Sequence, residues 1–443
     1  MTDLNANINW DNYREAVNAC QPMKLQGKIV KIAGLVAEGL GPGLSVGSQC
    51  VIENPEGNHI QAEVVGFKDK RVILMPFGEM RGIKPGSRIV DIDRRPLFTV
   101  GEGYLGRVID GLGRPIDGKG PIKGEKEYPI YGDPLNPLNR EVIREATDVG
   151  VGAVNALVTV GKGQRIGIMA GSGVGKSVLM GMIAKNTAAD VVVIALIGER
   201  GREVREFIEG SLGEEGLRKS VVIASTSDSP ALVRIRGSHL ATTLAEYFRD
   251  KNLDVILMMD SITKFAMALR EVGLAAGEPP SAKGYTPSVF AEIPKLLERA
   301  GTVEKRGSIT GIYNVLVEGD DMNEPIADAV RSTVDGHIVL SRRLAEKGHY
   351  PAVDVLASIS RVMKDVVDPE HLESARRLIK VLSTYREAED LINIGAYVDG
   401  SDPEIDFAKS MIVRINAFLQ QDIHQKVSFQ ESVARLQGLF SDN

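Results

Sequence analysis

The 443-residue chain lacks several features that would assign it to particular protein classes. Its only cysteines, Cys20 and Cys50, are too few for a disulfide framework and fit a reducing cytosol. Its 6 histidines are scattered without the spacing of metal ligands, so we do not expect a zinc enzyme. No run approaches the roughly 18 consecutive apolar residues of a membrane-spanning helix. We also do not expect the polar, acidic segment 1–18 to be a secretory signal.

Positive charge is also scarce, because 53 lysines and arginines against 59 acidic residues give a net charge of −6. This argues against nucleic-acid binding through bulk positive charge, although it leaves room for a local basic groove. Hydrophobic residues make up 43% of the chain, enough for a real core, and the length predicts about three domains. Of the 47 glycines, only Gly395, Gly400 and Gly438 follow residue 348, which predicts a helical C-terminal part.

The N-terminal part contains short β-branched runs separated by turns rich in glycine and proline. These runs are Gly27–Ile32, Ser48–Ile52, Ile60–Phe67, Arg71–Met75 and Ser87–Ile92. Five or six short strands at this spacing predict a small closed barrel. The stretch 99–150 is again rich in glycine and proline, and we expect it to be a connector.

From about residue 151, apolar runs alternate with amphipathic stretches of helical length. The runs are Arg165–Met169, Val191–Leu196, Val221–Ala224, Val255–Met259, Ser308–Val317 and His337–Leu340. Uniformly apolar strands that alternate with helices predict a parallel sheet covered on both faces. After residue 365 only helices are expected, at His371–Thr384, Glu387–Ile394, Asp402–Gln421 and Ser428–Phe440.

The strongest motif is Ala170-Gly-Ser-Gly-Val-Gly-Lys-Ser177, between an apolar strand and a helical run. This is the context of a P-loop, whose glycines turn backbone N–H groups toward phosphate oxygens at a helix N-terminus. Lys176 would reach the β- and γ-phosphates, and the Ser177 hydroxyl would bind Mg²⁺. The strict pattern has glycine at the first position, where this chain has Ala170. The alternative is a glycine-rich turn without a ligand.

Two acidic residues follow apolar strands of the same sheet. Asp260 ends the run Val255–Met259 and could hold Mg²⁺, although an aspartate that caps the next helix has the same sequence pattern. Glu199 lies in Gly198-Glu-Arg-Gly-Arg-Glu203, after the run Val191–Leu196. It could orient and polarise an attacking water, but a solvated helix start with a glutamate in its first turn fits the spacing equally well.

Two further residues lie in Tyr350-Pro-Ala-Val-Asp-Val-Leu-Ala-Ser-Ile-Ser-Arg361. Arg361 could stabilise γ-phosphate charge, in its own site or a neighbour's, or could pair with a structural carboxylate. Tyr350 could stack on adenine or simply pack. Near the N-terminus, Trp10, Tyr13 and Val17 share one face of a short helix, which would either pack on the chain's own barrel or dock a partner.

The segment 351–360 resembles the signature of the hexameric ATPase family that includes rotary ATP synthase α and β subunits and the ATPases of type III protein export. The resemblance covers about residues 24–440, in the family's order of barrel, connector, P-loop, Gly-Glu-Arg, acidic strand end, signature and helical tail. Several runs resemble the export branch, and its flagellar members more than its injectisome members: Gly198–Phe207, Met258–Ala266, Gly273–Pro280, Gly284–Phe290 and Glu318–Pro325.

The resemblance implies an α/β fold with a central P-loop (RecA-like) parallel-sheet domain, an N-terminal small β-barrel and a C-terminal helical domain. The implied division is a partner-binding segment at 1–23, the barrel at 24–95, the ATPase domain at 96–368 and the helical domain at 369–443. It also implies a magnesium-dependent ATPase that energises flagellar protein export as a homohexameric ring.

The resemblance assigns catalytic roles to Lys176, to Glu199 as activator of water, and to Arg361 as a residue supplied in trans across a subunit interface. Mg²⁺ would be held at Ser177 and Asp260. The nucleotide would be bound by Ala170, Gly171, Ser172, Gly173, Val174, Gly175, Lys176, Ser177, Val178, Arg200 and Tyr350. Three positions depart from the family pattern outside this catalytic set, namely Lys264, Asp148 and Asn155.

The partners implied are an inhibitory stator-type protein at the N-terminal segment, a central stalk protein, and the export gate, chaperones and export substrates, without nucleic acid. The expected location is the cytoplasm, peripheral at the inner membrane of a bacterium. The alternatives are an injectisome ATPase, then a rotary synthase catalytic subunit, which would need a second kind of ring subunit. A ring RNA translocase would need stacking aromatics in its N-terminal domain, where residues 24–92 offer only Phe67 and Phe77.

Overall fold

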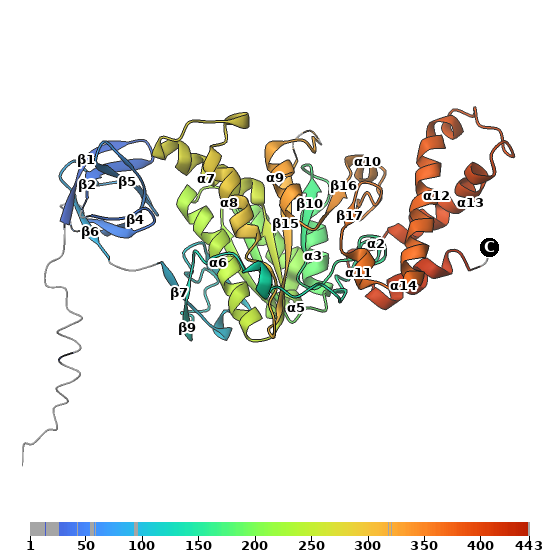
Figure 1. The fold of residues 1–443 in the computed structure, drawn as a ribbon, viewed down its shortest axis with the longest axis horizontal. Helices are drawn as coiled ribbons and strands as arrows, with labels where there is room; N and C mark the ends of the chain where they lie inside the picture. Colours follow the sequence, from blue (N-terminus) through green and yellow to red (C-terminus); the bar gives the residue numbers. More distant parts are fainter. Residues whose placement is uncertain are drawn as a thin grey trace, which may run out of the picture. The chain divides into compact units, whose positions relative to one another are not determined.

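The computed structural model describes position 14 and residues 26–441, apart from positions 42, 54–56, 58, 93–95, 318 and 320. The expected docking face of Trp10, Tyr13 and Val17 therefore lies outside the described residues and stays a prediction. The chain forms two compact units, Met1–Arg95 and Pro96–Asn443, which are described separately below (Figure 1).

The first unit contains a closed antiparallel barrel with strand order β1-β2-β5-β4-β3-β6. Its strands are β1 (Gln26–Ala33), β2 (Val36–Leu40), β3 (Gln49–Glu53), β4 (His59–Lys68), β5 (Arg71–Pro76) and β6 (Arg88–Asp91). Alternate side chains such as Ile52, Leu74 and Ile89 are fully buried and fill the barrel. The predicted small barrel is confirmed, and β2 is the strand that the sequence did not indicate.

The second unit is built on a mixed sheet with the order β17-β16-β10-β15-β13-β11-β12-β8, with β14 paired to β15. Its strands are β8 (Arg107–Asp110), β10 (Arg165–Ala170), β11 (Val191–Ile197), β12 (Ser220–Ser225), β13 (Asp254–Asp260), β14 (Gly301–Thr302), β15 (Ser308–Leu316), β16 (Gly336–Leu340) and β17 (Ile359–Ser360). The six predicted apolar runs are all present and mutually parallel. The expected connector is more than a link, because it supplies the parallel edge strand β8 and takes part in a two-stranded antiparallel sheet of β7 (Leu97–Val100) with β9 (Lys126–Pro129).

Helices cover both faces of this sheet (Figure 1). On one face, α6 (Ala231–Asp250) and α7 (Ile262–Ala276) pack against the strands. On the other, α2 (Gly152–Leu157) and α3 (Lys176–Asn186) share a core with every second residue of the strands. The remaining helices of this part are α4 (Gly201–Glu206), a π-helical turn (Phe207–Leu212), α5 (Gly213–Arg218), α8 (Pro287–Leu297), α9 (Pro325–Thr333), α10 (Arg342–Glu346) and α11 (Met363–Val366), with 3₁₀ turns at Glu102–Tyr104, Pro137–Asn139 and Ala282–Gly284.

The C-terminal part consists of α12 (Pro369–Asn393), α13 (Pro403–Leu419) and α14 (Phe429–Gly438). The two helices expected at His371–Thr384 and Glu387–Ile394 form the single helix α12, so that prediction was wrong. The polar residues between them interrupt the apolar pattern but include no glycine or proline to break a helix. None of the described helices is long and apolar enough to cross a membrane.

A polar seam joins the C-terminal helices to the loop before α2. Asn155 Nδ2 donates to Asp148 Oδ1 at 2.8 Å and to the carbonyl of Val427 at 3.3 Å. The side-chain amide of Gln421 donates a hydrogen bond to the carbonyl of Gly150 and accepts one from the N–H of Gly152. Two of the departures from the family pattern, Asp148 and Asn155, are therefore partners of each other within this seam.

Candidate functional site

The motif after β10 forms the predicted strand–turn–helix. Gly173 and Gly175 have φ values of 78° and 90°, a region that residues with a Cβ rarely adopt, so the turn requires glycine there. Ala170 is the last residue of β10 and is 1% exposed, so the departure from glycine places a small side chain inside the sheet. Val174 is buried, whereas Val178 in the first turn of α3 is 42% exposed.

Three of the predicted catalytic and metal-binding residues converge at this edge of the sheet. Lys176 Nζ, at the start of α3, lies 2.6 Å from Asp260 Oδ1 at the end of β13. The same nitrogen lies 3.8 Å from Oε1 of Glu199, which follows β11. The side chains are only 4% exposed for Asp260 and 15% for Glu199. One cation thus lies between two buried carboxylates at the carboxyl ends of parallel strands, where ligands bind in sheets of this type.

Glu199 is held close to neutrality by its surroundings. Burial and the nearby Asp260 carboxylate raise its pKa, Lys176 partly offsets them, and the net pKa is about 7. A hydrogen bond to Glu203 also favours the protonated form of Glu199, and it lowers the pKa of Glu203. The two carboxyls therefore share a proton, and Glu199 is poised to gain or lose it near pH 7.

Glu203 is a residue whose contribution the sequence did not reveal. It was visible only as an acid in the first turn of a charged helix, and it does lie in the first turn of α4. The signal that could have found it is its place in the first turn of the helix that begins just after Glu199, because that turn lies next to the end of β11. Arg200 pairs with Glu203 at 3.6 Å and is 76% exposed, so its side chain lies at the rim of the cluster.

The donor set at this edge fits a divalent cation that also binds phosphate oxygens. Among the described residues no group of three or more histidine, cysteine, aspartate or glutamate side chains could hold a metal ion. Mg²⁺ typically keeps one or two protein carboxylates or hydroxyls and takes its other ligands from phosphates and water. The buried carboxylate of Asp260 and the hydroxyl of Ser177, next to Lys176 on α3, match that requirement.

Tyr350 lies beside the phosphate loop. A Cβ placed on Gly175 would come within 3.6 Å of the Tyr350 ring, and the tyrosine is 45% exposed. Its carbonyl accepts a hydrogen bond of 3.0 Å from the backbone N–H of Gln421. Tyr350 therefore offers a partly open aromatic face next to the loop and is tied to the C-terminal seam.

Arg361 lies at the opposite edge of the same sheet. It follows β17, whose Ser360 pairs with Gly336 at the start of β16. At the other end of β16, Leu340 pairs with Ala170, the residue from which the phosphate loop departs. Four residues of strand separate these levels, or about 13 Å, and β17 runs away from the loop. Arg361 is exposed, and its backbone lies at the edge of the sheet away from the phosphate loop of its own chain.

Comparisons with known proteins decide the family. Models described as the ATP synthase alpha/beta family match residues 29–93 (beta-barrel domain) and 150–360 (nucleotide-binding domain), and one described as the T3SS EscN ATPase C-terminal domain matches 367–438. A flagellum-specific ATP synthase of Bacillus subtilis is 53% identical, covering 96% of this chain and 97% of that one. One of Pseudomonas aeruginosa is 51% identical over 97% and 96%. The chain belongs to the ATP synthase alpha/beta family.

The solved structures point to the same branch. The assembled ATPase EscN from the type III secretion system of enteropathogenic E. coli, determined alone and with its central stalk EscO, matches with TM-scores of 0.89 and 0.86. Both matches are 45% identical and cover 93% of this chain and 99% of EscN. The predicted fold class, the family with its protein-export branch and the expected ATPase activity are confirmed.

Proposed function

We propose that the chain hydrolyses ATP with Mg²⁺ in a homohexameric ring and that this hydrolysis energises protein export through the flagellar type III secretion system. The observation that carries the chemistry is the contact of Lys176 with Asp260 and Glu199 beside the phosphate loop. The names of the closely similar flagellar relatives support the biological role.

Binding of ATP would redistribute the charges of this cluster. Lys176 would leave Asp260 for the β- and γ-phosphates, which are stronger partners than a single carboxylate. Ser177 and Asp260 would hold Mg²⁺, which when bound neutralises phosphate charge. The backbone N–H groups from Gly171 to Val178 would surround the phosphates at the N-terminus of α3, with Ala170 behind them, and Tyr350 would face adenine.

Glu199 would orient and polarise the attacking water. Its pKa of about 7 lies near the working pH, where a general base is most effective. A proton taken up by Glu199 can be shared with Glu203, because the two carboxyls are already hydrogen-bonded. Arg200, at the rim of the cluster, would contact the nucleotide from the solvent side.

Arg361 would act on a neighbouring subunit's site. It lies at the edge of the sheet opposite its own phosphate loop, so a second copy must bring its loop to Arg361. A closed ring of identical subunits satisfies every site in this way, because each head-to-tail interface pairs one loop with one arginine. The assembled state of EscN supports such a ring.

Several partners follow from this proposal. A stalk protein would occupy the central channel, as supported by the complex of EscN with its central stalk EscO. A stator-type inhibitor would bind the N-terminal segment, and the export gate, chaperones and export substrates would contact the ring. The ring would work in the cytoplasm, peripheral to the inner membrane.

The second candidate is the ATPase of a virulence injectisome, which is favoured by the 45% identity to EscN and by the match of the EscN C-terminal domain. The chemistry would be the same. Expression of the gene in a non-motile strain that lacks its flagellar ATPase distinguishes the two, because restored swimming requires flagellar export. Failure to restore swimming together with restored injectisome secretion would favour the second candidate.

The catalytic assignment is tested by Lys176→Ala, which should abolish Mg²⁺-dependent ATP hydrolysis because the phosphates lose their main cationic partner. The matched control is Lys185→Ala in the last turn of the same helix, which should keep the wild-type rate. Full turnover by Lys176→Ala would overturn the assignment. The rate per subunit should also rise with protein concentration as rings assemble, and a flat profile would contradict sites shared between subunits.

A further inference from the structure

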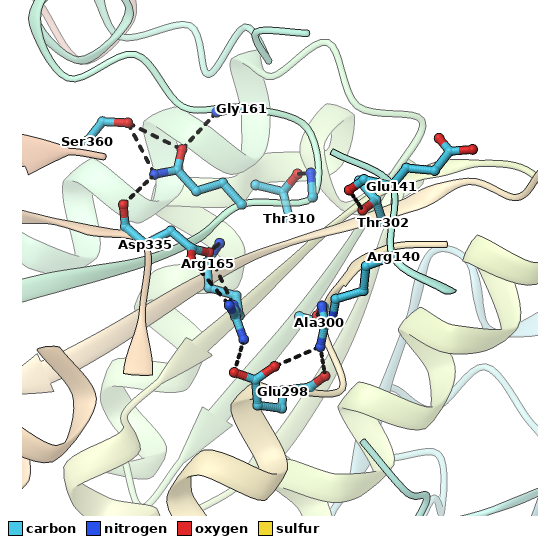
Figure 2. Close-up of polar contacts among 12 residues, drawn as sticks. Arg140, Glu141, Gly161, Arg165, Glu298, Ala300, Thr302, Thr310, Asp335 and Ser360 are labelled. Atoms are coloured by element: carbon cyan, nitrogen blue, oxygen red, sulfur yellow. Dashed lines mark hydrogen bonds and ion pairs between the residues drawn. The ribbon is translucent and has the colours of Figure 1, made fainter. Parts of the chain in front are cut away.

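Gln164, directly before β10, is a fully buried polar residue to which the sequence assigned no role. Its Oε1 accepts a hydrogen bond of 2.8 Å from the N–H of Gly161. Its Nε2 donates to the carbonyl of Asp335 and to the hydroxyl of Ser360, both at 3.1 Å (Figure 2). The amide is thus satisfied at both ends, and its donor bonds reach the residue before β16 and a residue of β17.

Both of these acceptors also constrain the backbone at Arg361, the residue that follows β17. Ser360 directly precedes Arg361, and its hydroxyl also donates to the carbonyl of Thr159 at 2.7 Å. The Asp335 carbonyl, which Gln164 contacts, accepts the backbone N–H of Arg361 at 2.9 Å. Gln164 therefore fixes the main chain at Arg361 from two directions, through the preceding side chain and through the acceptor of its own N–H.

The surroundings make this support rigid. Arg165 donates from its backbone N–H and its guanidinium to the Asp335 carboxylate at 3.1–3.2 Å, and it also pairs with Glu298 (Figure 2). Arg140 binds the same Glu298 carboxylate at 2.8 Å. By contrast, no ion pair given for the described part of the chain holds the exposed Arg361 side chain. The backbone therefore sets the point from which the Arg361 side chain extends.

We propose that Gln164 is the positioning residue for the arginine that each subunit supplies to its neighbour's catalytic site. The inference rests on the proposed role of Arg361 in trans. A transition-state contact depends steeply on placement, and a shift of about 1 Å can cost roughly a hundredfold in rate. Loss of the Gln164 amide would leave the backbone at Arg361 with fewer constraints while the same subunit's phosphate loop stays intact.

The test uses Gln164→Met, which keeps the side-chain length but removes the hydrogen bonds of the amide. We expect kcat to fall about 10- to 100-fold, with the KM for ATP changed by less than about twofold, because the subunit's own nucleotide contacts are untouched. Ser360→Ala removes the same link from the other side and should show the same split. The control is Thr310→Val, which removes a neighbouring buried hydrogen bond to Gly163 that does not lead to Arg361 and should keep kcat.

Mixed rings separate positioning from a merely structural role. In a ring formed from Gln164→Met and Glu199→Gln subunits, the variant's intact site receives Arg361 from a Glu199→Gln neighbour at about a quarter of the interfaces. The rate should then rise severalfold above the sum of the two separate proteins, as it should for Arg361→Ala mixed with Glu199→Gln. Rescue of Arg361→Ala without rescue of Gln164→Met or Ser360→Ala would overturn the positioning role. Failure of the Arg361→Ala mixture itself would overturn the proposed action in trans.

Discussion

Charged side chains are paired in opposite ways at the two edges of the central sheet, that is, where its parallel strands end and where they begin. At the edge that carries the phosphate loop, one lysine is shared between two buried carboxylates, and the pKa of one of them is raised to about 7. At the other edge, Arg165 binds Asp335 through several hydrogen bonds, and Gln164 uses both ends of its amide. The first cluster is arranged to change partners and the second to keep them.

This difference follows from what each edge has to do. A site that must accept phosphates, a cation and a water cannot have all its polar groups paired in advance, and the raised pKa of Glu199 reflects this. A group supplied to another subunit must instead be delivered in one position, which favours a saturated network. The comparison would fail if changes to the hydrogen-bonded network at the second edge left the rate of ATP hydrolysis unchanged.

The largest expected effect that tests the comparison is that of Arg361→Ala. Turnover should fall about 10³-fold, the order found where such arginines stabilise phosphoryl transfer, while nucleotide binding is retained because the subunit's own loop is unchanged. Steady-state ATPase assays and binding of a fluorescent nucleotide measure the two quantities. Lys364→Ala, an exposed cation three residues later, is the control and should be near wild type. Loss of binding in proportion to turnover would place Arg361 in its own subunit's site.

The parallel core could be predicted because its strands are uniformly apolar. The motif that follows β10 and the acids that end β11 and β13 could then be placed at one edge, since parallel strands bring their carboxyl ends together. The barrel strand β2 and the edge strands β8 and β17 were missed because they are short or contain polar residues and glycine. The local pattern of apolar residues does not predict such strands, because their pairing depends on the neighbouring strands in the fold.

The second edge could not be foreseen for a related reason. Gln164, Asp335 and Ser360 are far apart in the sequence, and none carries a motif of its own. Their contact depends on the antiparallel pairing of β17 with β16, which the sequence did not indicate. The sequence motif gave Arg361 a candidate role, but only the register of these strands shows that it lies away from its own phosphate loop.

A second prediction compares how much a carboxylate at each edge contributes to the free energy of unfolding. Asp335→Ala should lower the free energy of unfolding by about 2 kcal/mol, because Arg165 loses several charge-assisted hydrogen bonds. Glu199→Gln should leave stability unchanged or raise it at pH 8. Because the pKa of Glu199 is raised from 4.5 to about 7 on folding, the folded state loses stability as the pH rises from 4.5 to about 7, and this loss is complete at pH 8. Glutamine does not ionise and escapes the loss.

Thermal unfolding of the two variants at pH 6 and pH 8 measures this contrast. The midpoint of Asp335→Ala should be below that of the wild type at both pH values. The unfolding midpoint of Glu199→Gln should rise relative to that of the wild type between pH 6 and pH 8. Asp328→Ala on the exposed side of α9 serves as the control for loss of a surface carboxylate. Equal destabilisation by Asp335→Ala and Glu199→Gln would remove the distinction between the two edges.

The smallest expected effect is a shift in pH dependence caused by Glu203→Gln. In the wild type, kcat/KM should rise with pH through about 7 as Glu199 loses its proton. The Glu203 carboxylate raises the pKa of Glu199 both by its charge and by accepting a hydrogen bond from the protonated form. Removing that charge should therefore lower the pKa of Glu199 and move the acid limb of the profile to lower pH.

The measurement compares kcat/KM profiles of the wild type, Glu203→Gln and Glu206→Gln from pH 5.5 to pH 8.5 (about three pH units around the expected midpoint). Titration of ATP itself is common to all three proteins and cancels in the comparison. Glu206 lies on the same helix with a side chain 60% exposed, so its variant should keep the wild-type limb. An acid limb that stays in place, or moves to higher pH, would mean that Glu203 does not share the proton of Glu199. The side chains beside the phosphate loop would then be paired as stably as those at the other edge.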